Sequence, residues 1–263
     1  MTGGHWAPGP SPVPVVAGPP VRVLYLHGLG CSTSIWEPAV AAAGPRIEPW
    51  VVRLPWHGLD DGGWSHRADP VALLAETLRE YRPFDVVVAH SFAAMLLVEA
   101  VAAGLVEPVP AVLVSTFHRR DPDQFNWDTL VYYTTGFQRI FAEALRIGRD
   151  DIDPTRLDTA SQLLRDRIGP YGWMRFFDAF LRSPFVDLAA VTAPHLVITG
   201  DEDIATRPAD ATGLAAALPH GRAAVLTGCG HFPMVEQPAR FAAEVDAFLD
   251  QLTLTSRTHL EPI

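Results

Sequence analysis

The sequence is poor in cysteine, in positive charge and in long hydrophobic runs, and each shortage excludes a class of protein. Only two cysteines, Cys31 and Cys229, occur in 263 residues, so the chain has no disulfide framework and fits a reducing compartment. The net charge of −10 argues against a nucleic-acid partner, which would need a basic face. No apolar run approaches the roughly 18 residues of a membrane span.

Two further signals are missing. The ten histidines show neither Cys-x-x-Cys nor His-x-x-x-His spacing, which argues against a metal site. The N-terminus lacks the basic start and the apolar stretch of a secretory signal. We therefore expect a cytoplasmic protein with no metal and no cofactor.

Hydrophobic patterning predicts one globular domain of the α/β class. Residues 1–20 are rich in proline and favour a disordered leader. From residue 21 onward, short apolar strands alternate with helices, which is typical of a mostly parallel, doubly wound sheet covered on both faces. The expected strands are 21–26, 47–54, 84–89, 111–115, 195–199 and 222–226. The expected helices of this sheet region are 35–43, 70–81, 92–103 and 238–252, and the last ten residues form a tail.

The alternation breaks between residues 117 and 185. This stretch shows no buried strand pattern and favours helices at 138–147, 154–167 and 170–182. We therefore divide the chain into an α/β core, residues 21–116 and 186–263, and a helical cap, residues 117–185. Aromatic side chains are frequent in the cap, where they either anchor short helices to the core or face a substrate pocket. The residues expected at the pocket are Trp56, Trp127, Tyr132, Tyr133, Phe137, Trp173, Phe177 and Phe232.

The segment Ala89-His90-Ser91-Phe92-Ala93 joins an apolar strand directly to a helix. A sharp strand-to-helix turn holds its central residue in a strained, accessible position, which is how a serine nucleophile is presented at the end of a sheet. Small residues must flank such a turn because the two backbones pass close together, and both flanking residues here are alanine. The simpler alternative is that Ser91 only caps the helix that follows it.

Three other predicted strand ends carry polar or glycine-rich turns. His27-Gly28-Leu29-Gly30 follows the first strand, Gly200-Asp201-Glu202-Asp203 follows the fifth, and Gly230-His231 follows the sixth. A serine, then an acid, then a histidine is the chain order of one known class of serine hydrolase sites. With these motifs, nearly the whole chain resembles the α/β-hydrolase superfamily.

The resemblance implies a role for each motif. Ser91 would be the nucleophile, His231 its base, and Asp203, the fourth residue of the Gly-x-x-Asp turn, the acid; Asp201 is the second candidate for the acid. The backbone N–H groups of Leu29 and Phe92 would form the oxyanion hole.

Three functions remain open. The favoured one is a serine esterase or thioesterase that cleaves a small-molecule apolar acyl substrate through an acyl-enzyme. A carrier protein or coenzyme A would be the partner if the substrate is a thioester. The second is a C–C bond hydrolase, acyltransferase or cyclase with the same triad, and the third is a non-enzymatic small-molecule receptor. Haloalkane dehalogenases and epoxide hydrolases are disfavoured, because these relatives place Asp where Ser91 stands.

Overall fold

The structure is a computed structural model that describes residues 20–60, 63–67, 69–146 and 153–258. Apart from residue 20, the leader expected at residues 1–20 lies outside the described residues. Residues 259–263 of the expected tail lie outside them as well.

A six-stranded parallel sheet forms the centre of the molecule, in the order β2-β1-β3-β4-β5-β6. Every residue of β3, β4 and β5 is buried, as expected for apolar strands covered on both faces. The α/β class predicted from the sequence is therefore confirmed. The strands are β1 (Val21–Leu26), β2 (Ile47–Val52), β3 (Val86–His90), β4 (Ala111–Val114), β5 (His195–Gly200) and β6 (Gly221–Leu226).

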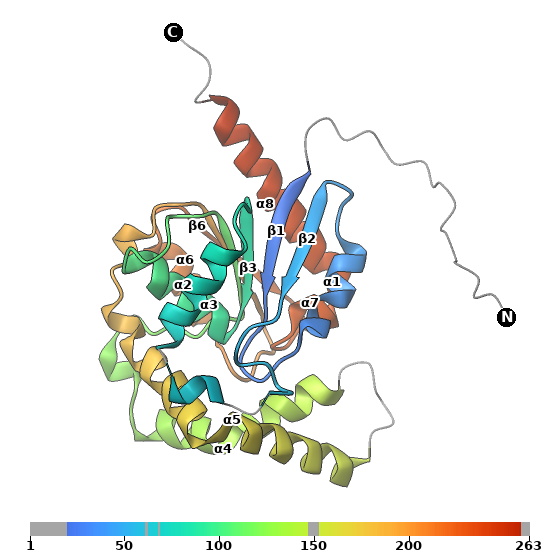
Figure 1. Cartoon of the computed structure of the whole chain (residues 1–263), viewed down its shortest axis with the longest axis vertical. Coiled ribbons are helices and arrows are strands. Elements are labelled where there is room, and N and C mark those ends of the chain that lie inside the picture. Colours follow the sequence, from blue (N-terminus) through green and yellow to red (C-terminus); the bar gives the residue numbers. More distant parts are fainter. Residues whose placement is uncertain (1–19, 61–62, 68, 147–152, 259–263) are drawn as a thin grey trace, which may run out of the picture.

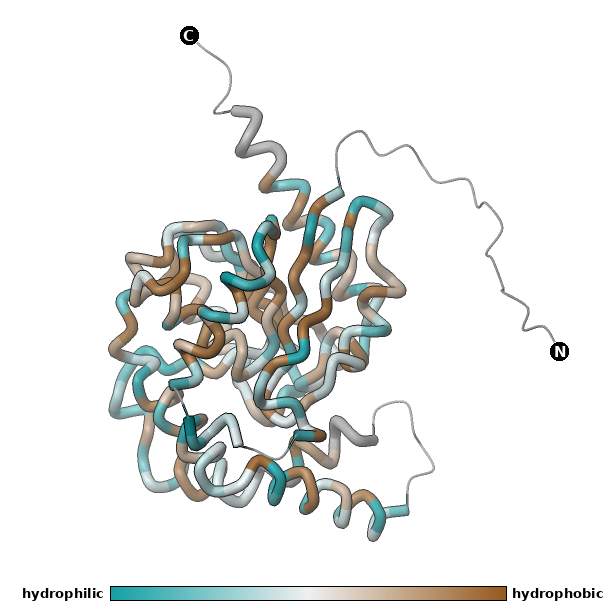
Figure 2. Tube along the Cα trace, in the orientation of Figure 1, coloured by the Kyte–Doolittle hydropathy of each residue, from teal (hydrophilic) through white to brown (hydrophobic). Residues whose placement is uncertain are grey.

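Helices cover the two faces of this sheet (Figure 1). On one side α1 (Glu37–Ala42), α7 (Pro233–Glu236) and α8 (Pro238–Thr258) pack against one another. On the other side α2 (Pro70–Glu80) packs against α3 (Phe92–Ala102), and α6 (Pro208–Ala217) packs against β5 and β6. Hydrophobic residues follow the strands into the interior (Figure 2). No helix in the described ranges is long and apolar enough to cross a membrane.

Local sequence signals explain several of these helix boundaries. The Asp69 side chain accepts a hydrogen bond from the Val71 N–H at 2.8 Å, and Pro70 occupies the first helical position, so α2 begins where the sequence predicts. By contrast, α3 is buried on nearly its whole circumference, because it follows the central strand β3 directly.

Two long helices, α4 (Trp127–Arg146) and α5 (Pro154–Arg182), lie between β4 and β5 in the chain. We call this pair the helical segment. It lies beyond the carboxyl ends of the strands, on the side of the molecule away from the C-terminus (Figure 1). α5 is kinked at Gly169, which has a φ of 68° and precedes Pro170, so its halves correspond to the helices expected at 154–167 and 170–182.

Three helix predictions need correction. α4 begins at Trp127 and not near residue 138; the Thr134 and Thr135 hydroxyls bond to carbonyls one turn earlier, which accommodates β-branched residues in the helix. α6 has no counterpart among the expected helices, because its Ala-rich sequence carries hardly any large apolar side chain. α8 extends to Thr258 beyond the predicted end at 252.

Five short 3-10 helices complete the described elements. One of them, η1, takes the first residues of the helix expected at 35–43, so that α1 proper begins only at Glu37. The five are η1 (Thr33–Trp36), η2 (Gly63–His66), η3 (Pro122–Gln124), η4 (Ser183–Phe185) and η5 (Leu188–Ala190).

Candidate active site

Ser91 occupies the turn between β3 and α3 with φ 54° and ψ −115°. A non-glycine residue in this region is strained, and such strain is held only where the surroundings determine it. The Ser91 N–H donates to the Val114 carbonyl at 2.8 Å, which ties the turn to β4. Across from it, a Cβ on Gly28 would lie 2.8 Å from His90 Nδ1. Position 28 therefore requires glycine if the first strand end is to approach the turn.

The structure brings Ser91, His231 and Asp203 together from three separate strand ends. Ser91 Oγ lies 3.2 Å from His231 Nε2, and His231 Nδ1 lies 2.9 Å from Asp203 Oδ2 and 3.1 Å from Oδ1. Since a carboxylate only accepts, Nδ1 of His231 carries the proton and Nε2 is free to accept one from the serine hydroxyl. All three side chains are buried.

Asp203 is held by its own loop as well as by His231. Its Oδ1 accepts the N–H groups of Ala205 at 2.7 Å and Thr206 at 2.9 Å, and its Oδ2 accepts the Thr206 hydroxyl. Burial opposes ionisation of Asp203, but the interaction with His231 and the bonds from Thr206 outweigh it and lower the pKa of the carboxyl. The carboxylate is therefore charged and oriented near neutral pH.

Two residues fix the loop that carries His231. The Glu236 carboxylate accepts the N–H groups of Gly230 at 2.6 Å and Phe232 at 2.8 Å. His90, beside the serine, donates from Nε2 to the His231 carbonyl at 3.0 Å. Burial holds the pKa of His90 well below its ordinary value, so its ring is neutral and links β3 to the histidine loop.

The first strand end supplies the turn expected to bind an oxyanion. Within the described residues, the backbone N–H groups of Leu29 and Phe92 donate to no other group. His27 supports this turn: its Nδ1 donates to the Gly28 carbonyl at 2.9 Å and its Nε2 accepts the Leu54 N–H at 3.0 Å. The loops after β1 and β3 lie side by side where the strand order reverses, the usual place for a site in an open α/β sheet.

A small cavity of about 20 Å³ lies at Ser91. That is room for about one water molecule. Its wall is largely apolar, and the helical segment supplies part of it. The lining residues are Leu29, Cys31, His90, Ser91, Phe117, Ile140, Phe141, Phe176, His231 and Phe232.

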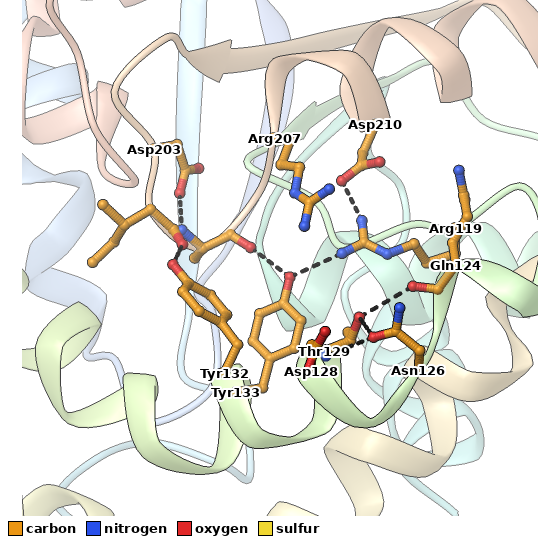
Figure 3. Close-up of a pocket in the computed structure, with 12 residues that line it drawn as sticks. Arg119, Gln124, Asn126, Asp128, Thr129, Tyr132, Tyr133, Asp203, Arg207 and Asp210 are labelled. Carbon is orange, nitrogen blue, oxygen red and sulfur yellow. Dashed lines mark hydrogen bonds and ion pairs between the residues drawn. The ribbon is translucent and has the colours of Figure 1, made fainter.

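A second, open cleft of about 630 Å³ lies on the other side of Asp203, between the Asp203 loop and the start of α4 (Figure 3). Its lining is polar. The buried Arg119 and the partly buried Asp210 form an ion pair in its wall, and the hydroxyl groups of Tyr132 and Tyr133 point toward the Asp203 loop.

Of the aromatic residues expected at the pocket, the structure places Phe232 in the Ser91 cavity and Tyr132 and Tyr133 in the polar cleft. Trp173 and Phe177 line a third, shallow pocket between α4 and α5. The side chain of Phe137 lies outside the described part of the chain.

The two remaining tryptophans lie away from the Ser91 cavity. The Trp56 ring is buried against Trp64 and Phe92, and its Nε1 donates to the His27 carbonyl at 3.2 Å. Trp127, at the start of α4, is 80% exposed. A bulky residue at position 56 therefore fills the core beneath the turn.

Several residues of the site were not among the sequence candidates. Thr206 and Glu236 hold the acid and the histidine loop, and Phe117, Ile140 and Phe176 shape the cavity. Thr206 follows Asp203 by three residues, a spacing typical of side chains that bond to a local turn. The apolar residues carry no such signal, because any buried aromatic residue has the same pattern.

Asp201, the second candidate for the acid, is exposed and accepts the Gly228 N–H at 2.7 Å. It stabilises the neighbouring turn, whereas His231 is bonded to Asp203. In the described ranges, no cluster of three or more His, Cys, Asp or Glu side chains is arranged to hold a metal ion.

Comparisons with known proteins agree with this fold. The model of the alpha/beta hydrolase family matches residues 23–244, and the protein therefore belongs to the alpha/beta hydrolase family. A comparison with curated protein sequences gave no significant match.

Solved structures with a similar fold include proteins of different activities. An esterase from Rhodococcus sp. ECU1013 is 20% identical with a TM-score of 0.61, and 88% of this chain aligns with 90% of that one. MenH from S. aureus is 15% identical with a TM-score of 0.61, covering 89% and 95% of the two chains. A bromoperoxidase from Bacillus anthracis is 17% identical with a TM-score of 0.60, covering 89% and 93%. At these identities the likeness concerns the fold alone.

Proposed function

We propose that the protein is a serine hydrolase that cleaves an ester or thioester of an apolar acyl substrate. The observation that carries the proposal is the continuous set of hydrogen bonds from Ser91 through His231 to Asp203, with Ser91 in a strained turn at the centre of the sheet. Membership of the alpha/beta hydrolase family and the esterase among the similar structures support it.

The chemistry follows from the direction of these bonds. Ser91 Oγ attacks the substrate carbonyl carbon while His231 Nε2 takes the hydroxyl proton, and Asp203 stabilises the imidazolium that results. The N–H groups of Leu29 and Phe92 stabilise the oxyanion of the tetrahedral intermediate. His231 then gives its proton to the leaving alcohol or thiol, and the C–O or C–S bond breaks to leave an acyl group on Ser91. A water activated by His231 releases the acid and regenerates the serine.

The apolar wall of the cavity supports an apolar acyl group. A cavity of about 20 Å³ is far smaller than the several hundred Å³ that ligand sites occupy, so an acyl chain enters only when part of the wall moves. Ile140 and Phe141 belong to α4, and Phe176 belongs to α5. We therefore propose that residues 117–185 act as a cap whose displacement admits the substrate.

A second candidate function is favoured by the largely apolar wall of the same cavity. Such a wall keeps bulk water away from Ser91, which suits a reaction that is selected by the bound substrate or by an acceptor other than water. An acyltransferase, a cyclase or a C–C bond hydrolase would use the same Ser91, His231 and Asp203. Such an enzyme would acylate Ser91 but turn over simple esters poorly.

The first experiment is labelling with a fluorophosphonate probe, followed by intact mass and peptide mapping. We expect a single adduct on Ser91 in the folded protein, no adduct after heat denaturation and none in the Ser91→Ala variant. A Ser91→Ala protein that is labelled as fast as the wild type would exclude Ser91 as the nucleophile. A folded wild-type protein that resists the probe and retains a tightly bound apolar ligand would favour the receptor function.

A further inference from the structure

Two neighbouring tyrosines of α4 bond to the loop that carries Asp203 (Figure 3). The Tyr133 hydroxyl donates to the Ala205 carbonyl at 2.9 Å, and the Tyr132 hydroxyl donates to the Ile204 carbonyl. The helical segment therefore contacts the Asp203 loop by hydrogen bonds as well as by packing.

These two carbonyls belong to the peptide groups that hold the acid. The Ile204 carbonyl shares its peptide group with the Ala205 N–H, and the Ala205 carbonyl shares its peptide group with the Thr206 N–H. Both N–H groups donate to Asp203 Oδ1, at 2.7 and 2.9 Å. Because a peptide group is planar and rigid, a bond to its oxygen orients its N–H. Hydrogen bonds in series also polarise one another, so each tyrosine strengthens a bond to the carboxylate.

Arg119 sets the direction of the Tyr133 hydroxyl. Its Nη2 donates to the Tyr133 oxygen at 3.2 Å, and its Nη1 is paired with Asp210. Its guanidinium also lies 5.2 Å from the centre of the Phe180 ring. Since Arg119 offers only donors, the single Tyr133 proton is left for the Ala205 carbonyl. Burial raises the pKa of Tyr133 to about 12, so the hydroxyl stays a donor near neutral pH.

We propose that Tyr133, oriented by Arg119, is a positioning residue for the catalytic acid Asp203, and that Tyr132 assists it more weakly. Tyr133 is 3% exposed and Tyr132 is 43% exposed, so water replaces the second bond more readily than the first. The proposal rests on the serine hydrolase function above.

The same helix also walls the cavity at Ser91 through Ile140 and Phe141. The same helix therefore contributes both to the wall of the cavity and to the alignment of the acid.

The first test uses NMR to measure the hydrogen bond between His231 and Asp203, and it does not require turnover. The proton on His231 Nδ1 gives a low-field NMR resonance when it is bonded to a carboxylate, and the His231→Gln variant identifies this resonance by its loss. We expect Tyr133→Phe to move the resonance toward higher field and to speed its exchange with water. Tyr171→Phe is the matched control, because Tyr171 lies on α5 and is exposed. An unchanged resonance in Tyr133→Phe would overturn the proposal, even in a protein that hydrolyses nothing.

The second test is a double-mutant cycle on turnover. Tyr133→Phe should lower kcat about tenfold with KM within about twofold, since the buried hydroxyl loses its bonds to the Ala205 carbonyl and to Arg119. Tyr132→Phe should lower kcat about twofold, since only an exposed bond is lost. In a variant that already carries Asp203→Asn, Tyr133→Phe should lower kcat by less than about twofold, because Tyr133 affects turnover only by positioning Asp203. If the kcat losses of the two single variants multiply in the double variant, Tyr133 acts independently of Asp203.

Arg119→Lys separates positioning from folding. Lysine keeps the charge beside Asp210 but lacks the planar fork that reaches Tyr133 as well. We expect this variant to remain folded and to reproduce the kcat loss and the resonance shift of Tyr133→Phe. A loss of thermal stability with a normal His231 resonance and normal kcat would leave Arg119 and Tyr133 as structural residues only, and the proposal would be wrong.

Discussion

The sheet and the helical segment position their parts of the site in different ways. At the strand ends, backbone geometry fixes the reactive groups: Ser91 by a strained turn bonded to β4, and Asp203 by two N–H groups of its own loop. In the helical segment, side chains alone reach the site, through Ile140, Phe141 and the two tyrosines. Substitutions in the sheet region should therefore abolish chemistry, whereas substitutions in the helical segment should tune it.

The largest effect is expected at Ser91. Both Ser91→Ala and Ser91→Gly should lower turnover by at least about 10⁴-fold, because the nucleophile is removed. Ser91→Gly should also raise the free energy of unfolding by about 1 kcal/mol relative to Ser91→Ala, since glycine adopts a φ of 54° without strain. Ester turnover and urea unfolding measure the two effects. Equal stability of the two variants would show that the turn stores no strain.

The next effect separates the two acidic residues. Asp203→Asn should lower kcat by about 10⁴-fold, because an amide opposite Nδ1 favours the wrong tautomer of His231. Asp201→Asn is the matched control and should change kcat less than about threefold, since the amide oxygen still accepts the Gly228 N–H. Steady-state kinetics of the two variants decide between them. The reverse order of losses would move the acid to Asp201.

Lowering the pH should decrease the stability of the folded protein, because buried histidines resist protonation. Burial lowers the pKa of His27, after β1, and of His118, in the connection between β4 and α4, to about 4, against about 6.5 in an unfolded chain. Between these values the unfolded state binds more protons, so stability rises with pH through this window and is lost on acidification. Each of these two histidines should make the free energy of unfolding up to about 2 kcal/mol lower at pH 5 than at pH 7.5.

Urea unfolding across pH 4.5–7.5 checks this prediction. His118→Gln should remove one of the contributions and make the dependence less steep, and the matched control is the wild type at the same pH values. A dependence as steep in His118→Gln as in the wild type would show that His118 titrates normally when folded.

The smallest effect concerns selectivity in the helical segment. Phe141→Ala enlarges the cavity beside Ser91 and should raise the rate for bulky acyl groups relative to acetyl by about tenfold. Trp127→Ala, on the same helix but 80% exposed, is the control and should leave selectivity unchanged. A panel of ester chain lengths measures both. Equal rate losses for every chain length in Phe141→Ala would mean that the residue only supports packing.

The sheet could be predicted from the sequence, and the helical segment only in part. Each strand is a short apolar run, and Ser91, Asp203 and His231 follow strand ends, so their convergence follows from a parallel sheet. All of α6 was missed because its Ala-rich sequence lacks an apolar stripe of helical period. The start of α4 was missed although Leu130, Tyr133, Ile140 and Phe141 recur at helical spacing, because the threonines and the glycine among them have low helix propensity. The Tyr133 hydroxyl bonds to the Asp203 loop, which is distant from it in the sequence. No local sequence pattern predicts such a contact.

The strand order also has a consequence for synthesis of the chain. Ser91 follows the third strand, whereas Asp203 and His231 follow the fifth and sixth, and β5 pairs with β4 on one side and with β6 on the other. In a nascent chain, 140 residues therefore separate Ser91 from His231, its proposed base. If His231 activates Ser91 as proposed, labelling of Ser91 by a fluorophosphonate would report the moment at which the ends of β3, β5 and β6 have come together.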